Sequence, residues 1–308
     1  MSSYLDGKAA VVTGAGGGIG RAIALALAAE GAKVVVNDLG GGLDGSGASN
    51  APADAVVEEI AEDGGTAVAN YDDVSRFDAA GRIIQTSVDA FGGIDILVNN
   101  AGISRPGWFY EMEEEDFDAV VNVHLKGTFN CSRHACGPMM ERRWGRIVNI
   151  SSGAGIIGSV ERVSYAAAKA GIFGMTNTMS RDLGPFGITV NAVCPGPTDT
   201  RMLQNSIRRA KEAEARGDPS SALAGSGLLR VRPYDPEDLA PLVAHLCTEA
   251  AGNVNGQVFH SSGSEFGWFQ PLHVARAIYT NGRWSQDELA DIMPRSLTRG
   301  LQNPAPPA

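Results

Sequence analysis

The chain has 308 residues, of which 44% are hydrophobic and 19% are charged, enough for an α/β domain with a full core. With a net charge of −10 and dispersed Lys and Arg we expect neither nucleic acid nor a membrane as partner, and the scattered cysteines and histidines argue against disulfides and a metal site. Because we find no signal-peptide layout, no apolar run long enough to span a membrane and no terminal S-K-L signal, we expect a soluble cytoplasmic protein.

Short β-branched runs alternate with longer alanine-rich amphipathic stretches. The strand candidates are continuous apolar runs, as is typical of strands buried on both faces of a sheet. We therefore predict one α/β domain over residues 1–308, a Rossmann-type doubly wound fold with a seven-stranded parallel sheet and a ligand cleft at the strand carboxyl ends. The predicted strands are 9–13, 33–37, 66–69, 94–99, 146–151, 188–193 and 257–260, and the predicted helices are 19–30, 53–62, 76–91, 114–140, 164–183 and 236–248.

A glycine-rich turn, TGAGGGIG at residues 13–20, follows the first predicted strand and precedes the first helix. Glycines at 14, 18 and 20 permit a tight turn and allow backbone amides to approach a pyrophosphate at the helix N-terminus. The second strand ends at Asp38, whose carboxylate can accept hydrogen bonds from both ribose hydroxyls and repels a 2′-phosphate. Since no Arg or Lys stands at 15–19 or 39–42, we predict NAD rather than NADP as the cofactor.

Three stretches interrupt the alternation of strands and helices. Residues 40–52 are rich in Gly, Ser and Asn, and we interpret them as a surface loop beside the adenosine site without chemistry of its own. Residues 201–233 form an Arg-rich insertion after the sixth strand, and residues 265–308 extend beyond the last strand.

Tyr165 and Lys169 are four residues apart on one predicted helix and therefore share a face. A lysine cation together with a cofactor's positive charge favours the phenolate and lowers the phenol pKa from about 10 toward about 7, where it is useful for acid–base catalysis. Ser152, thirteen residues before Tyr165, is able to hydrogen-bond the same substrate oxygen. Alone, the Y-x-x-x-K pattern also fits an ordinary helix start with a solvated lysine.

Taken together, these motifs resemble the short-chain dehydrogenase/reductase family. TGAGGGIG (13–20), NNAG (99–102), Asn122, Ser152, YAAAK (165–169) and PGPTDT (195–200) occur in the family's order and spacing, and the resemblance covers residues 5–262. The stretches 34–41, 56–60, 67–74 and 239–247 are similar to the D-specific (3R)-hydroxyacyl-CoA dehydrogenase domain of multifunctional β-oxidation enzymes. Residues 201–233 and 265–308 show no such match, and the hydratase and sterol-carrier modules of those enzymes are absent from this sequence.

The resemblance implies a role for each motif residue. Tyr165 would exchange a proton with the substrate oxygen, Ser152 would polarise that oxygen, and Lys169 would hold the nicotinamide ribose. Asn122 would bind a water and pass protons onward, although without the resemblance it reads as a polar helix residue facing solvent. The implied NAD contacts, besides Tyr165 and Lys169, are Gly14, Gly18, Ile19 and Gly20 at the turn, Asp38 at the ribose, Asp73 and Val74 at the adenine, Asn100, Ala101 and Gly102 at the adenosine ribose, and Pro195, Gly196, Thr198 and Thr200 at the carboxamide.

Substrate recognition is the open part of the sequence. In this family the insertion after the sixth strand forms a lid, and its basic residues, Arg201, Arg208, Arg209, Lys211, Arg216, Arg230 and Arg232, suggest a dock for CoA phosphates. The alternative is a solvated helix with pairs such as Arg208–Glu212. The aromatic residues Trp268, Phe269, Tyr279 and Trp284 would cap a bulky substrate or, as is more common, pack against the body or a neighbouring subunit.

Three functions fit the sequence. The first is an NAD-dependent dehydrogenase of (3R)-hydroxyacyl-CoA, and the second is a hydroxysteroid or other bulky-alcohol dehydrogenase. The third is a non-catalytic dinucleotide-binding regulator, against which the complete set of Asn122, Ser152, Tyr165 and Lys169 argues, since a sensor needs no proton relay. The helices predicted at 114–140 and 164–183 resemble the family's subunit interface, so we expect a homotetramer.

Overall fold

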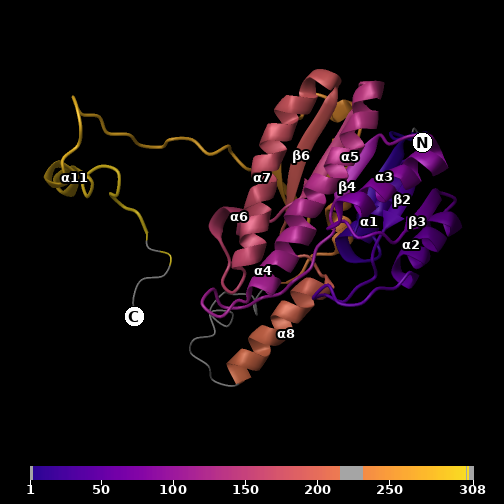
Figure 1. Cartoon of the computed structure of the whole chain (residues 1–308), viewed down its shortest axis with the longest axis horizontal. Helices are drawn as coiled ribbons and strands as arrows, with labels where there is room; N and C mark the ends of the chain where they lie inside the picture. Colours follow the sequence, from indigo (N-terminus) through magenta and orange to yellow (C-terminus); the bar gives the residue numbers. More distant parts are fainter. Residues whose placement is uncertain (1–2, 216–231, 303, 305–308) are drawn as a thin grey trace. The chain divides into compact units, whose positions relative to one another are not determined.

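The computed structural model describes residues 3–215, 232–302 and 304. Its centre is one sheet of eight strands in the order β3-β2-β1-β4-β5-β6-β7-β8 (Figure 1). Strands β1 to β7 are parallel, as predicted, and β8 runs antiparallel to β7. The strands are β1 (Ala9–Thr13), β2 (Lys33–Asn37), β3 (Thr66–Asn70), β4 (Ile96–Asn99), β5 (Gly145–Ile150), β6 (Ile188–Pro195), β7 (Val258–Ser262) and β8 (Glu265–Trp268).

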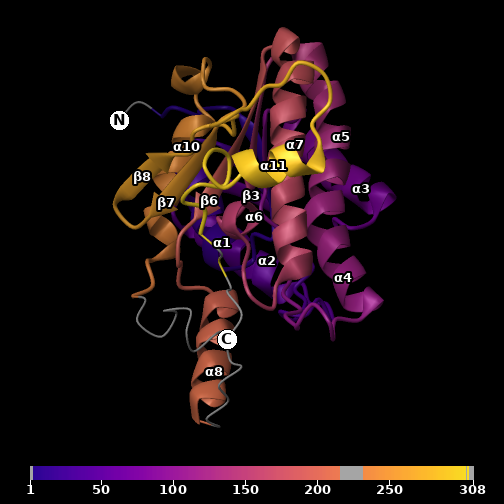
Figure 2. The ribbon, with the colours of Figure 1, turned by 90° about the vertical axis from the view of Figure 1, so that its left-hand side faces the viewer.

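Helices cover both faces of this sheet (Figures 1 and 2). The alternation of side chains along a strand divides the core in two, because Ala10 and Val12 pack on one face while Val11 packs on the other. The first core contains residues of α1 (Gly18–Ala29), α2 (Ala51–Glu62) and α10 (Ala240–Leu246). The second contains residues of α3 (Phe77–Phe91), α5 (Gly127–Arg142) and α7 (Val163–Leu183). The predicted α/β fold, a sheet with helices on both faces, is therefore confirmed.

The strand count of the prediction was wrong by one. The short strand β8 pairs with β7 in a hairpin whose register places Ser262 opposite Glu265. Gly263 adopts a φ of +59°, the left-handed conformation that a tight two-residue turn requires and that glycine allows at little cost. The sequence did carry this signal, Gly-Ser between two short runs, but β8 is only four residues long and mostly exposed, so it lacks the continuous apolar run by which the other strands were predicted.

The helix predicted over 114–140 is divided in two. It consists of α4 (Glu114–Val121) and α5, joined by a π-helical turn at Asn122–Lys126 in which the Gly127 N–H donates to the Asn122 carbonyl, five residues back. Such turns insert one residue into an α-helix and are frequent at functional sites. In the same way, the predicted helix 236–248 is a 3₁₀ turn (Pro236–Asp238) followed by α10. The predicted loop 40–52 ends two residues early, since α2 starts at Ala51 with a proline in its first turn.

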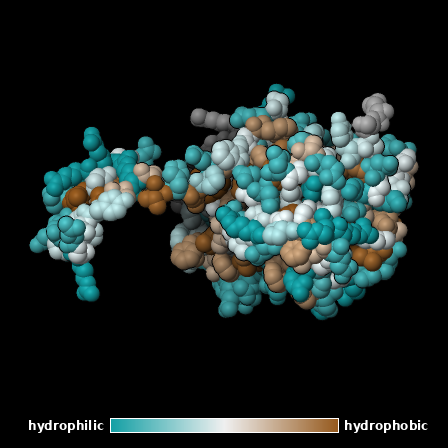
Figure 3. All heavy atoms as spheres, turned by 90° about the horizontal axis from the view of Figure 1, so that it is seen from above, coloured by the Kyte–Doolittle hydropathy of each residue, from teal (hydrophilic) through white to brown (hydrophobic). Residues whose placement is uncertain are grey.

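The chain forms two compact units, Met1–Phe269 and Gln270–Ala308. In the second unit, α11 (Gln286–Ile292) begins with a capping box in which Ser285 and Glu288 bond each other's backbone N–H groups. Other described helices of the first unit are α6 (Ala154–Ile157) and α8 (Arg201–Ala215). Among the described residues, no helix has the length and the apolar composition that crossing a membrane requires. Polar residues dominate the face seen in Figure 3, with hydrophobic residues in separate patches.

Candidate active site

A cleft of about 890 Å³ lies at the carboxyl ends of the central strands, a size typical of ligand sites. Gly14 follows β1, Asp38 follows β2, Asn100 follows β4 and Ser151 follows β5 along its wall. The structure brings all predicted site residues to this cleft: Gly14, Gly18, Ile19, Gly20, Asp38, Asp73, Val74, Asn100, Ala101, Gly102, Asn122, Ser152, Tyr165, Lys169, Pro195, Gly196, Thr198 and Thr200. Their individual roles stay predictions.

One end of the cleft, which we call the glycine end, consists of residues 14–20, Asp38, Asp73, Val74 and residues 100–102. Here the backbone is packed so closely that side chains are excluded. A Cβ atom on Gly14 would lie 2.7 Å from the Ala101 Cα, and one on Gly20 would lie 2.1 Å from the Gly14 carbonyl oxygen. The turn is therefore restricted to glycine at both positions.

Thr13 and Asn100 lock this turn against the end of β4. The Thr13 hydroxyl accepts hydrogen bonds from the backbone N–H groups of Asn100 (3.0 Å) and Ala101 (3.1 Å). In return, the Asn100 side-chain amide donates to the carbonyls of Thr13 and Gly14, both at 2.9 Å. Thr13 lies in the glycine-rich motif but was not predicted as a site residue. Its contribution is to position the turn rather than to line the cleft.

The glycine end fits a dinucleotide. No side chain caps the N-terminus of α1, so its first N–H groups are free of side-chain partners, and Gly17, Gly18 and Ile19 line the cleft there. A helix N-terminus of this kind binds phosphate groups through its amides and its dipole. At the next strand end, the Asp38 carboxylate is held by the N–H groups of Gly16 (2.8 Å) and Gly40 (2.7 Å). An anion is thus fixed where a ribose would lie.

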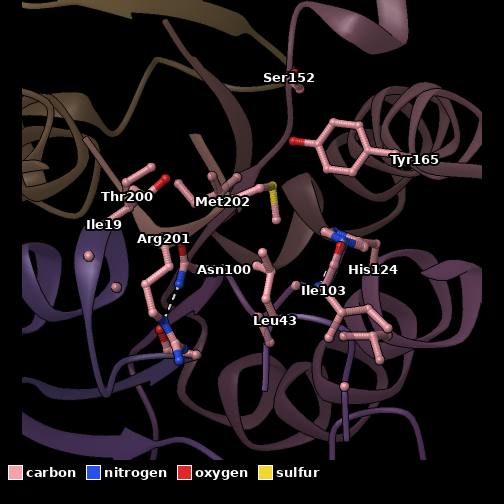
Figure 4. A pocket seen from close by; sticks show the side chains of 18 of the residues that line it. Ile19, Leu43, Asn100, Ile103, His124, Ser152, Tyr165, Thr200, Arg201 and Met202 are labelled. Carbon is pink, nitrogen blue, oxygen red and sulfur yellow. Dashed lines mark hydrogen bonds between the residues drawn. The ribbon is translucent and has the colours of Figure 1, made fainter. Parts of the chain in front are cut away.

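The predicted acid–base residues meet in the middle of the cleft. The Tyr165 hydroxyl is directed toward the side of the pocket where Ser152 lies (Figure 4). The Lys169 ammonium is 5.5 Å from the centre of the Tyr165 ring, is almost fully buried, and donates to the Ile150 carbonyl at 2.6 Å. Burial lowers the pKa of Lys169 to about 8. These three side chains come from the end of β5 and the first turns of α7.

The phenol of Tyr165 is less acidic in the chain alone than the sequence suggested. Burial raises the pKa of Tyr165 above its usual value, and the smaller opposing effects come from the Ser152 hydroxyl and the Arg162 guanidinium. We expected Lys169 to supply that lowering charge. In the chain alone the opposing effects come from Ser152 and Arg162, and a bound nicotinamide would add a further positive charge that favours the phenolate.

The π turn places two further polar residues at the cleft, Asn122 and His124. His124 is 2% exposed, and its ring meets the Tyr165 ring edge-on at 5.2 Å. Its Nε2 lies 3.1 Å from the Ile103 N–H and 2.9 Å from the Ile103 carbonyl, whereas Nδ1 has no partner among the described residues. Burial, followed by the charge of Lys169, lowers the pKa of His124 to about 3. The sequence analysis did not identify His124.

The other end of the cleft, which we call the α8 end, is formed by Leu43, Ile103, Val160, Arg162 and Met202 (Figure 4 labels three of them). The sequence analysis identified none of these five. The interpretation of residues 40–52 as a plain surface loop was incomplete, since Leu43 faces the cleft and its carbonyl accepts from the Ser104 N–H at 2.8 Å. No motif marks these positions, because an apolar wall can be built from many residue types.

The structure describes five of the seven basic residues predicted as a CoA dock. Arg208 forms the ion pair with Glu212 (3.1 Å) that the alternative interpretation named, and Arg209 pairs with Glu161 at 2.8 Å. Arg201 lines the cleft. Arg216 and Arg230 lie outside the described residues. The CoA dock stays a prediction. Its phosphate contacts would come mainly from Arg201 and from basic residues that form no ion pair.

Comparisons with known proteins agree on one family. Residues 8–211 match the family model described as short chain dehydrogenase. A crystal structure of a short chain dehydrogenase from Mycobacterium avium is similar over 98% of each chain, with 41% sequence identity and a TM-score of 0.80. Hydroxyacyl-CoA dehydrogenase ChsB1 of Mycobacterium tuberculosis is 39% identical over 298 residues, 92% of this chain and 87% of that protein. Peroxisomal multifunctional enzyme type 2 of Drosophila melanogaster is 41% identical over 88% of this chain, which spans only 41% of that longer protein.

Proposed function

Since this chain belongs to the short-chain dehydrogenase family and is an oxidoreductase acting on CH–OH groups, we propose that it interconverts a (3R)-hydroxyacyl-CoA and the 3-oxoacyl-CoA with NAD. Membership of the family confirms the resemblance read from the motifs and leaves no support for the non-catalytic regulator. The observation that carries the proposal is the meeting of Tyr165, Ser152 and Lys169 between a dinucleotide-shaped glycine end and an apolar α8 end. A relative that covers nearly the whole chain is named a hydroxyacyl-CoA dehydrogenase.

In the proposed reaction the C3 oxygen of the substrate lies at the hydroxyls of Tyr165 and Ser152. Tyr165 as phenolate accepts the proton of the C3 hydroxyl during oxidation and returns it during reduction. Ser152 donates a hydrogen bond that holds this oxygen in place, and Lys169 supplies a buried positive charge beside the phenol. Asn122, at the π turn, would pass the proton on through water. The nicotinamide, when bound, accepts or supplies the hydride.

We propose NAD as the cofactor because of Asp38. Its carboxylate is fixed by two backbone N–H groups at the cleft wall. A ribose 2′-hydroxyl would donate a hydrogen bond to it, whereas a 2′-phosphate would be repelled. The homotetramer and the cytoplasmic location stay predictions.

A bulky secondary alcohol such as a hydroxysteroid is the second candidate, and the walls of the cleft favour it. Leu43, Ile103, Val160 and Met202 give the cleft an apolar surface at the α8 end, which suits a bulky apolar alcohol. Both candidates share the same acid–base residues, so they differ only in what fills the α8 end.

The test is the loss of NADH absorbance at neutral pH with a 3-oxoacyl-CoA and, in parallel, with a ketosteroid that lacks CoA. We expect the acyl-CoA to be reduced with the higher kcat/KM, and NADH to be preferred over NADPH. Preferred turnover of the ketosteroid would replace the first candidate by the second. A higher kcat/KM with NADPH would contradict the role of Asp38.

A further inference from the structure

A guanidinium stands beside the phenol at the α8 end of the cleft. Arg162 directly precedes α7, and its carbonyl accepts from the Ala166 N–H at 2.8 Å, so it belongs to the turn from which Tyr165 projects. The Arg162 Cζ is 5.6 Å from the centre of the Tyr165 ring, and the residue lines the cleft. A second positive charge therefore lies beside the Tyr165 ring, in addition to that of Lys169.

This guanidinium is anchored without being neutralised. It donates a hydrogen bond to the Ser206 hydroxyl of α8, which is a neutral acceptor. The neighbouring carboxylate, Glu161, is 8% exposed and pairs with Arg209 instead. Among the residues that the structure describes, no carboxylate forms an ion pair with Arg162, whose side-chain partner is the Ser206 hydroxyl.

A part-buried guanidinium with one neutral acceptor retains unused donors. Arginine carries five N–H groups and keeps its charge in proteins. Burial lowers the pKa of Arg162, and the nearby Tyr165 and Glu161 offset this effect only in part. Such a group is stabilised by a ligand that brings oxygen acceptors into the cleft, because hydrogen bonds to a charged, partly desolvated donor are strong.

The position of Arg162 restricts what this ligand can be. Arg162 lines the same cleft as Tyr165 and Ser152 and directly precedes the helix that carries Tyr165, so we assign its acceptor to the substrate rather than to a dinucleotide at the glycine end. A 3-oxoacyl group has a second oxygen, on C1, only two carbon atoms from its reacting carbonyl. A simple ketone or a ketosteroid ring has no oxygen at that place. Charge and spacing thus favour an acyl substrate over an isolated ketone.

We propose that Arg162 is a specificity-determining residue that donates hydrogen bonds to the C1 oxygen of a 3-oxoacyl or 3-hydroxyacyl substrate while Tyr165 and Ser152 hold the C3 oxygen. This inference rests on the proposed function and makes it more specific, since it assigns the recognition of the acyl group to one side chain. A thioester and a free carboxylate both carry the C1 oxygen, so the test includes both.

The experiment measures kcat/KM for NADH-dependent reduction of acetoacetyl-CoA, of free acetoacetate and of methyl propyl ketone, which lacks the C1 oxygen. The quantity of interest is the kcat/KM for acetoacetyl-CoA, or for acetoacetate, divided by the kcat/KM for methyl propyl ketone. Any effect of Arg162 on the Tyr165 phenol is common to the three substrates and cancels in this ratio. Arg162→Met should lower the ratio by about 10- to 150-fold, the loss expected for hydrogen bonds to a charged group.

Three variants serve as controls. Arg181→Met removes an exposed arginine from the other end of α7 and should leave the ratio unchanged. Ser206→Ala removes the hydroxyl partner but keeps the guanidinium, so its ratio should stay near that of the parent chain. If Arg162→Met does not fold, Arg162→Lys gives the same test, since one ammonium group does not reproduce the planar fork of donors.

Equal losses for all three substrates would overturn the inference, because Arg162 would then act only on Tyr165 or on the fold. The parent chain tests the proposed function separately. If the parent chain reduces acetoacetate but no acyl-CoA, the proposed CoA substrate is rejected. The role of Arg162 can still be tested, with acetoacetate as the substrate that carries the C1 oxygen. If it reduces the monoketone but neither acetoacetyl substrate, both proposals are rejected.

Discussion

The two ends of the cleft are built in different ways. At the glycine end the wall consists largely of backbone in a tight turn, which a few short polar side chains hold in place: Asp38, bound by two N–H groups, and Thr13 and Asn100, whose bonds lock the turn. At the α8 end the wall consists of side chains from segments far apart in the sequence, such as Leu43, Ile103 and Met202. The first end depends on glycines that allow close backbone packing, and the second depends on the volume of its side chains.

This difference determines how freely each end can vary. A Cβ on Gly14 or Gly20 would overlap backbone atoms, so few sequences can form the glycine end. An apolar wall accepts any side chains of suitable volume, and volume-conserving exchanges of apolar residues cost little. We therefore expect the glycine end to be common to dinucleotide-binding relatives and the α8 end to decide which alcohol is oxidised.

Tyr165→Phe tests the acid–base chemistry without changing either end of the cleft, and it should have the largest effect on kcat. The variant loses the hydroxyl that exchanges the proton but keeps the ring that packs against His124. We expect kcat to fall by about 10²- to 10⁴-fold, the usual contribution of a general acid–base group. NADH binding, measured by fluorescence titration, should persist, because the glycine end is untouched.

Retention of more than a few per cent of kcat in Tyr165→Phe would contradict the assignment of the proton exchange to the Tyr165 hydroxyl. Loss of NADH binding in this variant would show instead that the two ends are coupled through the ring.

Gly20→Ala addresses the glycine end. The added methyl would meet the Gly14 carbonyl at 2.1 Å and the Asn100 side-chain amide at 2.5 Å, and backbone cannot give way at low cost. Overpacking of this kind destabilises by about 1–3 kcal/mol. We expect a lower Tm and weaker NADH binding, measured by thermal denaturation and titration.

Gly17→Ala in the same turn is the matched control for stability. Its φ of −178° is open to any residue, and a Cβ there has no neighbour within 4 Å. Its Tm should equal that of the parent chain. Equal losses of Tm in the two variants would mean that the turn is generally sensitive and that close packing at Gly20 is not the cause.

Much of the sheet and of the glycine end could be predicted from the sequence. The bounds of β1 and β2 were correct, because buried parallel strands are continuous apolar runs and the turn between β1 and α1 needs a glycine spacing that few other structures require. All predicted site residues line one cleft, because most of them follow a strand end or stand at a helix start, and Asn122 and Lys169 lie on helices beside it.

What escaped prediction depends on tertiary contacts. The π turn at Asn122–Lys126 changes no residue pattern, since hydrophobic spacing does not show a single inserted residue. Arg162 is a single arginine among many, and only the fold reveals that its neighbour Glu161 pairs with Arg209 and leaves it without a carboxylate. His124 likewise reads as a polar helix residue until burial against Tyr165 is known.

His124 offers the most specific test of how the two ends are joined, since it lies against Gly102 of the glycine end and bonds the backbone of Ile103 at the α8 end. Its pKa is lowered from 6.5 to about 3 in the folded chain, so between about pH 6.5 and pH 3 the unfolded chain binds a proton that the folded chain excludes. The free energy of unfolding should therefore fall as the pH drops through this window, by about 1.4 kcal/mol per pH unit from this group.

Urea denaturation of the parent chain and of His124→Gln at pH values from about 7 to about 4 measures this contribution as the difference in slope. His245→Gln, at an exposed position on α10, should keep the slope of the parent chain. If His124→Gln also keeps the slope of the parent chain, His124 is protonated or accessible in the folded state. The buried contact of a neutral His124 ring with Tyr165 is then ruled out. If the slope is lost, His124 is the group that excludes the proton in the folded chain, where it lies between Gly102 and Ile103.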